Sequence, residues 1–163
     1  MAQQQPDLTG RRAGLWKLEE WARRGQAATG SGRLAPTAGN TANFGIYASL
    51  GNTAWVTDVL FSTDTAIGWR LFPWLGNFLL PAGALVTLGP QGTFITGVTF
   101  GAVTGGPLAP TPVYASGFAP AGFCGSLIGR MKIFVTAGFS VVLQTDVAAL
   151  NCACTFIVIG AAQ

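Results

Sequence analysis

The chain contains no histidine among its 163 residues, and only 9% of them are Asp, Glu, Lys or Arg. Imidazole is the side chain whose ordinary pKa lies nearest neutral pH, so its absence removes the most usual general acid or base. The carboxylates do not replace it. Asp58 and Asp64 are six residues apart, which on a strand is roughly 20 Å, too far for a paired acid and base. We expect turn capping and salt links from the aspartates, no catalytic residues and no enzyme activity.

Cysteine is also scarce, with Cys124, Cys152 and Cys154 as its three occurrences. An odd number of cysteines, together with an N-terminus that lacks the apolar stretch of a signal peptide, favours reduced and buried thiols. A disulfide from Cys124 to Cys152 or Cys154 stays open as the alternative. A tetrahedral zinc site would need a carboxylate or a ligand from a partner chain, because zinc takes four ligands and histidine is absent. We therefore expect no metal and no other cofactor.

Charged side chains are missing altogether from residues 71–129, a run of 59 positions. Glycine and proline interrupt this run so often that no part of it could form a membrane-spanning helix. A soluble domain ordinarily has about a quarter of its residues charged. From residue 34 onward this chain has six, namely Asp58, Asp64, Arg70, Arg130, Lys132 and Asp146. We infer that other subunits cover much of the folded surface and that the protein does not enter a membrane.

Positive charge is concentrated in the first 33 residues. Six basic side chains oppose three acidic ones there, so this arm carries a net charge of +3, and the remaining 130 residues are neutral. A domain that binds nucleic acid would instead gather Lys and Arg along one folded surface. The distribution therefore predicts a basic arm on a neutral body, with no direct binding of nucleic acid.

The arm has the signals of one short helix over about residues 10–24. Asp7 or Thr9 can cap its start, Gly25 can end it, and arginines stand in its last turn, where the helix dipole favours cations. A helix of this length is marginal alone in water, so it needs either a partner or its own domain to lie on. The small residues of 26–40 indicate a flexible tether and favour a partner. The expected partner-binding residues are Leu15, Trp16, Leu18, Trp21, Arg23 and Arg24.

From about residue 41 the pattern changes to short apolar runs separated by turn residues. This pattern predicts an all-β domain over residues 41–163, preceded by an arm over residues 1–40. The expected strands are 43–50, 54–62, 68–73, 84–88, 93–102, 111–115, 125–135, 139–145 and 152–159. Strands of this number suit a jelly-roll-like antiparallel β-sandwich. The strand at 152–159 is apolar on both faces, so its outer face requires cover from another sheet or another copy of the chain.

Aromatic residues are concentrated early in the body, at Trp55, Phe61, Trp69, Phe72, Trp74 and Phe78. Large rings dominate the energetics of protein cores, so core packing is the first interpretation. An exposed platform that stacks carbohydrate rings or bases is the alternative. Contacts between subunits are a third possibility.

Three features stand together in one chain: the arm Leu15-Trp16-Lys17-Leu18-Glu19-Glu20-Trp21, the small residues Gly30-Ser31-Gly32, and the closing strands 139–145 and 152–159. A chain built in this order resembles the small structural proteins of virus particles, in particular the head decoration (cement) and spike proteins of tailed bacteriophages. The resemblance implies a homotrimer, made in the host cytoplasm and located on the capsid surface of the virion. There it would bind the major capsid protein or other virion subunits and stabilise the head shell. No active site is implied.

Other functions stay open at this point. Within the virion, the chain could be a spike base or a shell-forming coat protein instead of a decoration protein. A glycan- or receptor-binding spike module would use the aromatic residues near Trp69 and Trp74. An outer-membrane protein is favoured by the apolar strands and opposed by the absence of a signal-peptide-like segment.

Overall fold

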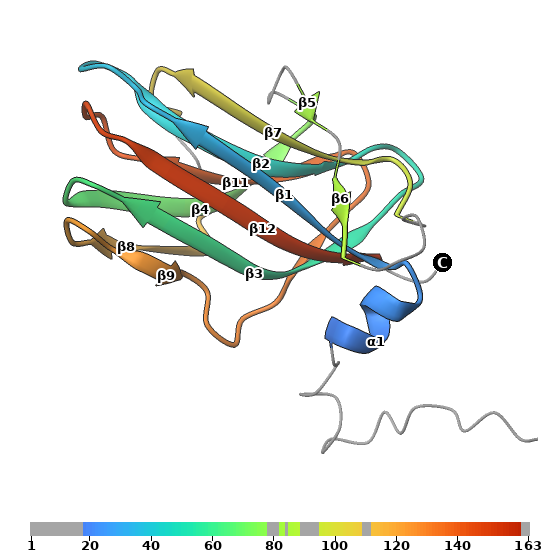
Figure 1. Cartoon of the computed structure of the whole chain (residues 1–163). Helices are drawn as coiled ribbons and strands as arrows, with labels where there is room; N and C mark the ends of the chain where they lie inside the picture. Colours follow the sequence, from blue (N-terminus) through green and yellow to red (C-terminus); the bar gives the residue numbers. More distant parts are fainter. Residues whose placement is uncertain (1–17, 78–81, 84, 89–94, 109–111, 161–163) are drawn as a thin grey trace, which may run out of the picture.

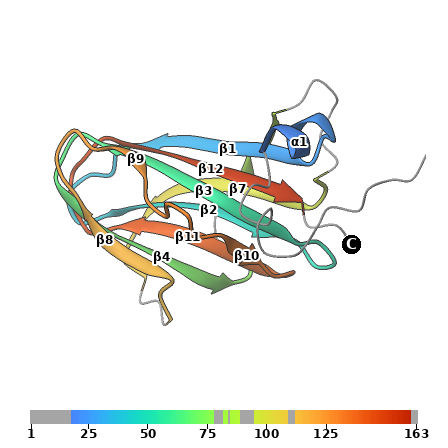
Figure 2. The ribbon, with the colours of Figure 1, turned by 90° about the horizontal axis from the view of Figure 1, so that it is seen from below.

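The structure is a computed structural model that describes residues 18–77, 82–83, 85–88, 95–108 and 112–160. Its elements are α1 (Leu18–Arg23), β1 (Ala27–Leu34), β2 (Thr41–Ala48), β3 (Ala54–Thr63), β4 (Ile67–Leu75), β5 (Ala82–Gly83), β6 (Val86–Thr87), β7 (Val98–Gly105), β8 (Ala115–Ala119), β9 (Cys124–Ser126), β10 (Ile133–Val135), β11 (Phe139–Thr145) and β12 (Cys152–Gly160). The strands form two antiparallel sheets packed face to face, as Figures 1 and 2 show from two sides. The predicted all-β sandwich is confirmed.

The strands pair as a long antiparallel ribbon folded over on itself, which is the connectivity of a jelly roll. The first strand β1 pairs with the last, β12, and the inner pairs are β2 with β11, β3 with β9 and β10, and β4 with β8. Sheet A has the order β10-β3-β12-β1-β6, with β9 also on β3, and sheet B has the order β5-β7-β2-β11-β4-β8. Successive ribbon pairs therefore alternate between the two sheets. The strands β5, β6 and β7 are an insertion between β4 and β8.

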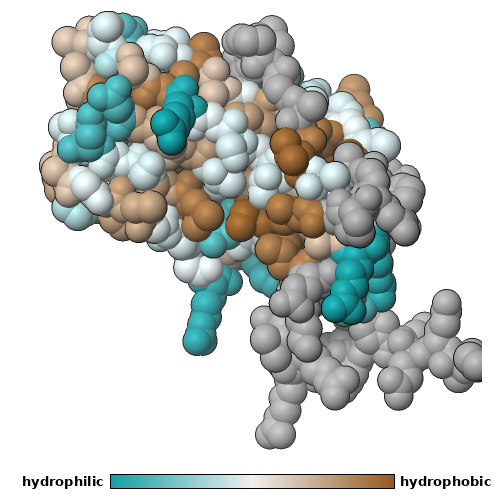
Figure 3. Space-filling view, in the orientation of Figure 1, coloured by the Kyte–Doolittle hydropathy of each residue, from teal (hydrophilic) through white to brown (hydrophobic). Residues whose placement is uncertain are grey.

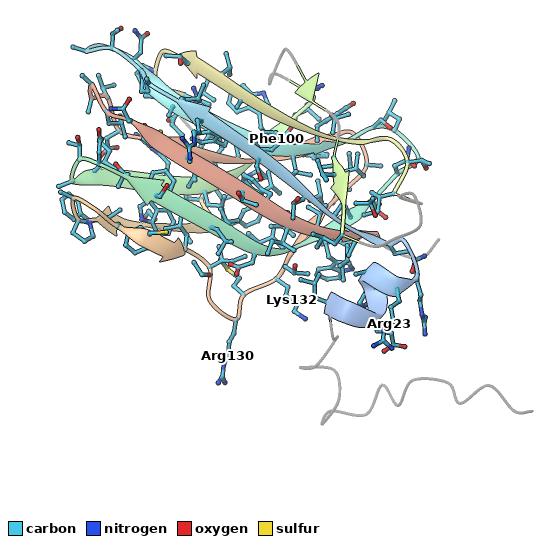
Figure 4. All side chains as sticks on the ribbon, viewed as in Figure 1. Arg23, Phe100, Arg130 and Lys132 are labelled. Carbon is cyan, nitrogen blue, oxygen red and sulfur yellow. The ribbon has the colours of Figure 1, made fainter. Side chains whose placement is uncertain are left out.

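Residues 27–34 form a strand where the composition predicts a flexible tether. β1 pairs with β12 over eight consecutive residues, so it is an inner strand of sheet A. Its glycines face sheet B: a Cβ atom on Gly30 would overlap Phe100 of β7, and one on Gly32 would come within 3.1 Å of the same ring. The small residues of β1 therefore allow the two sheets to approach closely at Phe100, which Figure 4 labels. The predicted arm over 1–40 is wrong in this respect, since the sandwich begins at Ala27.

The helix of the arm is seen only in part. α1 covers Leu18–Arg23, and residues 10–17 of the predicted helix lie outside the described residues. The last turn closes through backbone hydrogen bonds from Gly25 to Ala22 at 3.0 Å and from Gln26 to Trp21 at 2.9 Å. None of the described residues belongs to a helix with the length and apolarity that crossing a membrane requires.

Five predicted strands agree with β2, β3, β4, β11 and β12, and four segments differ. Within 84–88 the described strand is only the two-residue β6, and the strand expected at 93–102 begins later, as β7. The single strand expected at 125–135 is wrong, because a turn separates β9 from β10. In that turn Gly129 has φ +55°, a conformation that other residues rarely adopt, and the Met131 N–H donates to the Ile128 carbonyl at 2.9 Å. The strand expected at 111–115 occurs later, as β8, because Pro112 lacks the N–H that a paired strand needs.

The middle of the outer face of sheet B is buried, although that face points away from the core. Phe72, Val142 and Gln144 alternate with core residues such as Leu71 and have 0% exposure nonetheless. The connection from β7 to β8 contributes to this cover. In the orientation of the Gln144 side-chain amide that satisfies both of its groups, its NH2 donates to the Leu108 carbonyl at 3.3 Å and its oxygen accepts from the Leu108 N–H at 3.1 Å. The chain itself therefore supplies part of the cover that its apolar strands require.

The close contact between Gly30 and Phe100 yields a stability prediction. Gly30→Ala should lower the free energy of unfolding by about 1–3 kcal/mol, because the new methyl group overlaps a buried ring. Gly106→Ala is the matched control, since a Cβ atom there meets nothing within 4 Å, and it should change the free energy by less than about 1 kcal/mol. Urea unfolding measures both variants. Equal transition midpoints would contradict the packing of β1 against β7.

Candidate functional site

Six of the eleven large exposed apolar side chains among the described residues lie at one end of the sandwich. Figures 1 and 2 show that α1 lies at the same end. We term this the α1 end. It contains the starts of β1, β3 and β11 and the ends of β2, β4 and β12. Among the described residues, the large exposed apolar side chains at this end are Leu50, Leu75, Val86, Leu88, Phe134 and Phe139. Because exposed apolar surface gathered in one region marks interaction sites, the α1 end is the candidate functional surface.

A row of apolar side chains crosses the outer face of sheet A at the α1 end. Strand register places Phe134, Trp55, Ile159 and Ala27 in line across β10, β3, β12 and β1. The rings of Trp55 and Phe134 lie 4.9 Å apart. Ile159 and Ala27 have exposures of 1% and 0% although they face away from the core, and α1 packs beside β1 here. We infer that α1 covers this part of the row.

The predicted partner-binding residues are described only in part. Leu18 and Trp21 are half-buried, and the two arginines of the set are exposed. Leu15 and Trp16 lie outside the described residues. Within its described turns, α1 therefore lies against its own domain, which was one of the two alternatives for the arm. Its exposed face carries the arginines.

Cations border the apolar surface. Arg24 pairs with Glu20 at 2.7 Å, and because both side chains are more than half exposed, this pair adds little stability. Arg23 is exposed on the same helix, and Arg130 and Lys132 are exposed on the β9–β10 connection. Figure 4 shows these last three along one side of the molecule, with Arg130 pointing away from the body. In Figure 3 the hydrophilic groups of α1 lie close to hydrophobic groups on the outer face of sheet A.

The aspartates of the body have the structural roles that the sequence predicts. Asp64 accepts hydrogen bonds from the Asn151 side chain at 2.7 Å and from its backbone N–H at 2.8 Å. Asp146 forms an ion pair with Arg70 at 3.5 Å. Asp58 accepts from a backbone N–H and from a serine hydroxyl of β9. Asp58 and Asp64 therefore bind different groups and are not brought together as an acid and a base.

The cysteines are divided between core and surface. Cys152 and Cys154 are buried on the core side of β12, as predicted, whereas Cys124 is exposed on β9, so its predicted burial is wrong. All three are free thiols. In the part of the chain that the structure describes, no three His, Cys, Asp or Glu side chains are grouped so that they could hold a metal ion.

The aromatic residues that are concentrated early in the body lie in three places: the core and the outer faces of the two sheets. Phe61 is in the core and Trp69 packs against it. Trp55 lies on the outer face of sheet A, and Phe72 and Trp74 lie on the outer face of sheet B with ring centres 6.4 Å apart. The sixth, at position 78, lies outside the described residues. Trp69 and Trp74 face opposite sides of sheet B, so they do not form one stacking platform.

Sequence reasoning missed the exposed residues Leu50, Leu75 and Phe139. Each stands at a strand end or in a turn, where a pattern of apolar residues cannot separate the last core position from the first exposed one. A signal existed at Leu50, because it lies between Ser49 and Gly51. A large apolar residue inside a turn has no core to enter.

Comparison with protein-family models, with curated proteins and with solved structures found no match for this chain. Two features of the chain itself bear on its function: the jelly-roll connectivity and the apolar α1 end with cations at its border.

The placement of the cysteines predicts a thiol titration. Burial, with a smaller contribution from the charge of Asp64, raises the pKa of Cys152 to about 12. Burial also raises the pKa of Cys154 well above its ordinary value. Since the thiolate is the reactive form, dithionitrobenzoate at pH 8 should react rapidly with Cys124 alone in the native chain and with all three thiols after unfolding. Rapid native reaction of two or three thiols would contradict the burial of β12.

The hydrogen bonds of Asp64 predict a pH effect on stability. The Asn151 side chain and backbone N–H lower the pKa of Asp64 below its ordinary value. A carboxyl with a lower pKa in the folded state stabilises the fold above its unfolded pKa, and this stabilisation is lost as the pH falls through the folded pKa. Asp64→Asn should therefore lower the melting temperature at pH 7 and have a smaller effect at pH 3. Calorimetry at pH 7 and pH 3 measures the two melting temperatures. An equal decrease at both pH values would show that the charge of Asp64 is unimportant for stability.

Proposed function

We propose that this chain is a structural protein of a virus particle, a capsid decoration (cement) protein that forms homotrimers on the head shell and stabilises it. The observation that carries the proposal is the apolar α1 end on a jelly-roll sandwich. Jelly rolls recur in viral capsid proteins and in lectins, but one fold can host many functions, so the surface has to decide. Exposed apolar residues beside a basic arm suit the binding of another protein surface.

The mechanism would be mass action. A protein that binds the assembled shell, and not its dissociated subunits, stabilises the shell by its binding free energy. Each copy needs an interface of only about 800 Å² per partner for stable association. Symmetry then repeats this contribution over the whole particle.

The arm is the part of the chain that is best suited to reach the shell. Residues 1–17 precede α1 and contain three basic residues together with Leu15 and Trp16. The packing of α1 beside β1 fixes the position of Leu18, the first described residue after this segment. Trp and Arg are enriched among the residues that dominate interface energies. We therefore assign Trp16 to the shell contact and the half-buried Trp21 to the attachment of α1.

The structure changes how the arm has to be removed in a test. Deletion of residues 1–33 would take away most of β1 and leave one side of β12 unpaired. Deletion of residues 1–17 retains α1 and all of β1. The shorter deletion therefore separates loss of binding from loss of the fold.

Particle binding tests the proposal. Quantitative mass spectrometry of purified particles should find the chain at a constant copy number. When particles that lack the chain are mixed with purified protein, deletion of residues 1–17 or Trp16→Ala should weaken binding roughly 30-fold or more, the loss expected for an interface hot spot. Trp21→Ala should also lower the melting temperature, because Trp21 is half-buried. Trp16→Ala should leave that temperature unchanged.

Two outcomes would contradict the assignment. Absence of the chain from purified particles would refute a virion role. Normal binding by the chain that lacks residues 1–17 would refute the role of the arm. Binding of the isolated protein to a glycan array, together with weak binding to the shell, would favour the receptor-binding spike module instead.

A further inference from the structure

Three exposed apolar residues form one patch on the sheet B side of the α1 end. Leu75 and Phe139 pair across β4 and β11, and Leu50 comes from the turn between β2 and β3. Their exposures are 74%, 37% and 82% respectively. Gly138, which precedes Phe139, lies beside Leu50, because a Cβ atom at Gly138 would be 3.1 Å from the Leu50 side chain. We term Leu50, Leu75 and Phe139 the end patch.

Hydrogen bonds hold the chain segments of the end patch in place. The Gly138 N–H donates to the Ala48 carbonyl, and the Gly138 carbonyl accepts from the Gly76 N–H, both at 2.8 Å. The hydroxyl of the buried Ser140 donates to the Gly76 carbonyl at 2.7 Å. The patch is therefore preformed, and a partner that binds it does not have to order it first.

The end patch carries no ionised side chain. The segments that form it, 49–53, 75–77 and 136–139, contain no Asp, Glu, Lys or Arg. A surface that meets its own copy at a symmetry axis brings identical residues together, so a charge there would repel its equivalent. A neutral apolar patch avoids this repulsion, whereas the cations of the α1 end lie on α1 and on the β9–β10 connection. Charge therefore favours a second copy as the occupant of the end patch.

We propose that the end patch is the contact through which copies of this chain form a closed homo-oligomer. Leu50 and Leu75 supply most of the exposed apolar surface, and Phe139 packs beside them. Contact through the α1 end brings the arms of the copies close to one another. One consequence rests on the proposed virion function: arms gathered in this way bind a repetitive shell with higher avidity than a single arm does.

Self-association of the full chain, measured without particles, tests this contact. The double variant Leu50→Glu, Leu75→Glu places two carboxylates in the patch and should raise the dissociation constant of the oligomer at least about tenfold for each substitution. Both side chains are largely exposed, so circular dichroism should show an unchanged fold. Phe118→Glu is the matched control, because Phe118 is 69% exposed on the edge strand β8, where it pairs with Gly68 at the start of β4, the end of that strand opposite Leu75. Sedimentation velocity and native mass spectrometry give the oligomeric states.

Dissociation by the double variant, with Phe118→Glu still oligomeric, would support the proposal. A monomeric wild-type chain at about 100 μM, a concentration that detects even weak contacts, would overturn it. An oligomer that Phe118→Glu dissociates and the double variant does not would overturn it as well. A monomer that Leu50→Glu destabilises would assign the patch to another segment of the same chain. None of these results depends on particles, so failure of this contact is distinguishable from failure of the virion function.

Discussion

The pairing of β1 with β12 is the interaction on which the rest of the structure depends. It joins the first strand of the sandwich to the last over eight residues and so closes the ribbon whose inner pairs build both sheets. β1 can occupy this place only because Gly30 and Gly32 leave room for Phe100 of the opposite sheet. The same pairing sets Ala27 beside Ile159, on the row that α1 covers. The position of α1 therefore follows from the packing of small residues in the first strand.

The scarcity of charge has two separate causes in this fold. On the outer face of sheet B, the chain contributes its own cover: the connection from β7 to β8 reaches Gln144, and Phe72 and Val142 have no exposed surface. At the α1 end, by contrast, apolar residues stay exposed. A low proportion of charged residues thus indicates that surface is shielded from water. It does not distinguish cover by the same chain from contact with another chain. Six of the eleven large exposed apolar side chains of the described residues lie at the α1 end, so the exposed apolar surface is smaller than composition alone suggests.

The sequence predicted the strands correctly where apolar residues alternate with the period of a strand and face the core. The prediction failed where the same composition is compatible with two structures. The strands predicted at 139–145 and 152–159 match β11 and β12 closely, because these segments are rich in β-branched and aromatic residues, which favour strands. Gly30-Ser31-Gly32 has the composition of a tether and also that of a strand pressed against a ring, and only Phe100 decides between them. The candidate site was harder to predict. Leu75 is the last residue of β4 and Phe139 is the first of β11, and both continue the apolar alternation of their strands, so their exposure depends on where the opposite sheet ends.

The α1 end presents two surfaces of different chemistry, and this difference separates the two kinds of contact that are proposed for the chain. The end patch is neutral and preformed, so contact there changes little with salt and depends on the concentration of the chain. The border formed by Arg23, Arg130 and Lys132 is charged, so any contact made there weakens as salt rises. Because the two surfaces lie at the same end, the proposed assembly of copies through the end patch would turn the charged borders toward a common target. The proposed self-association would therefore precede binding to a larger surface, without either contact using the residues of the other.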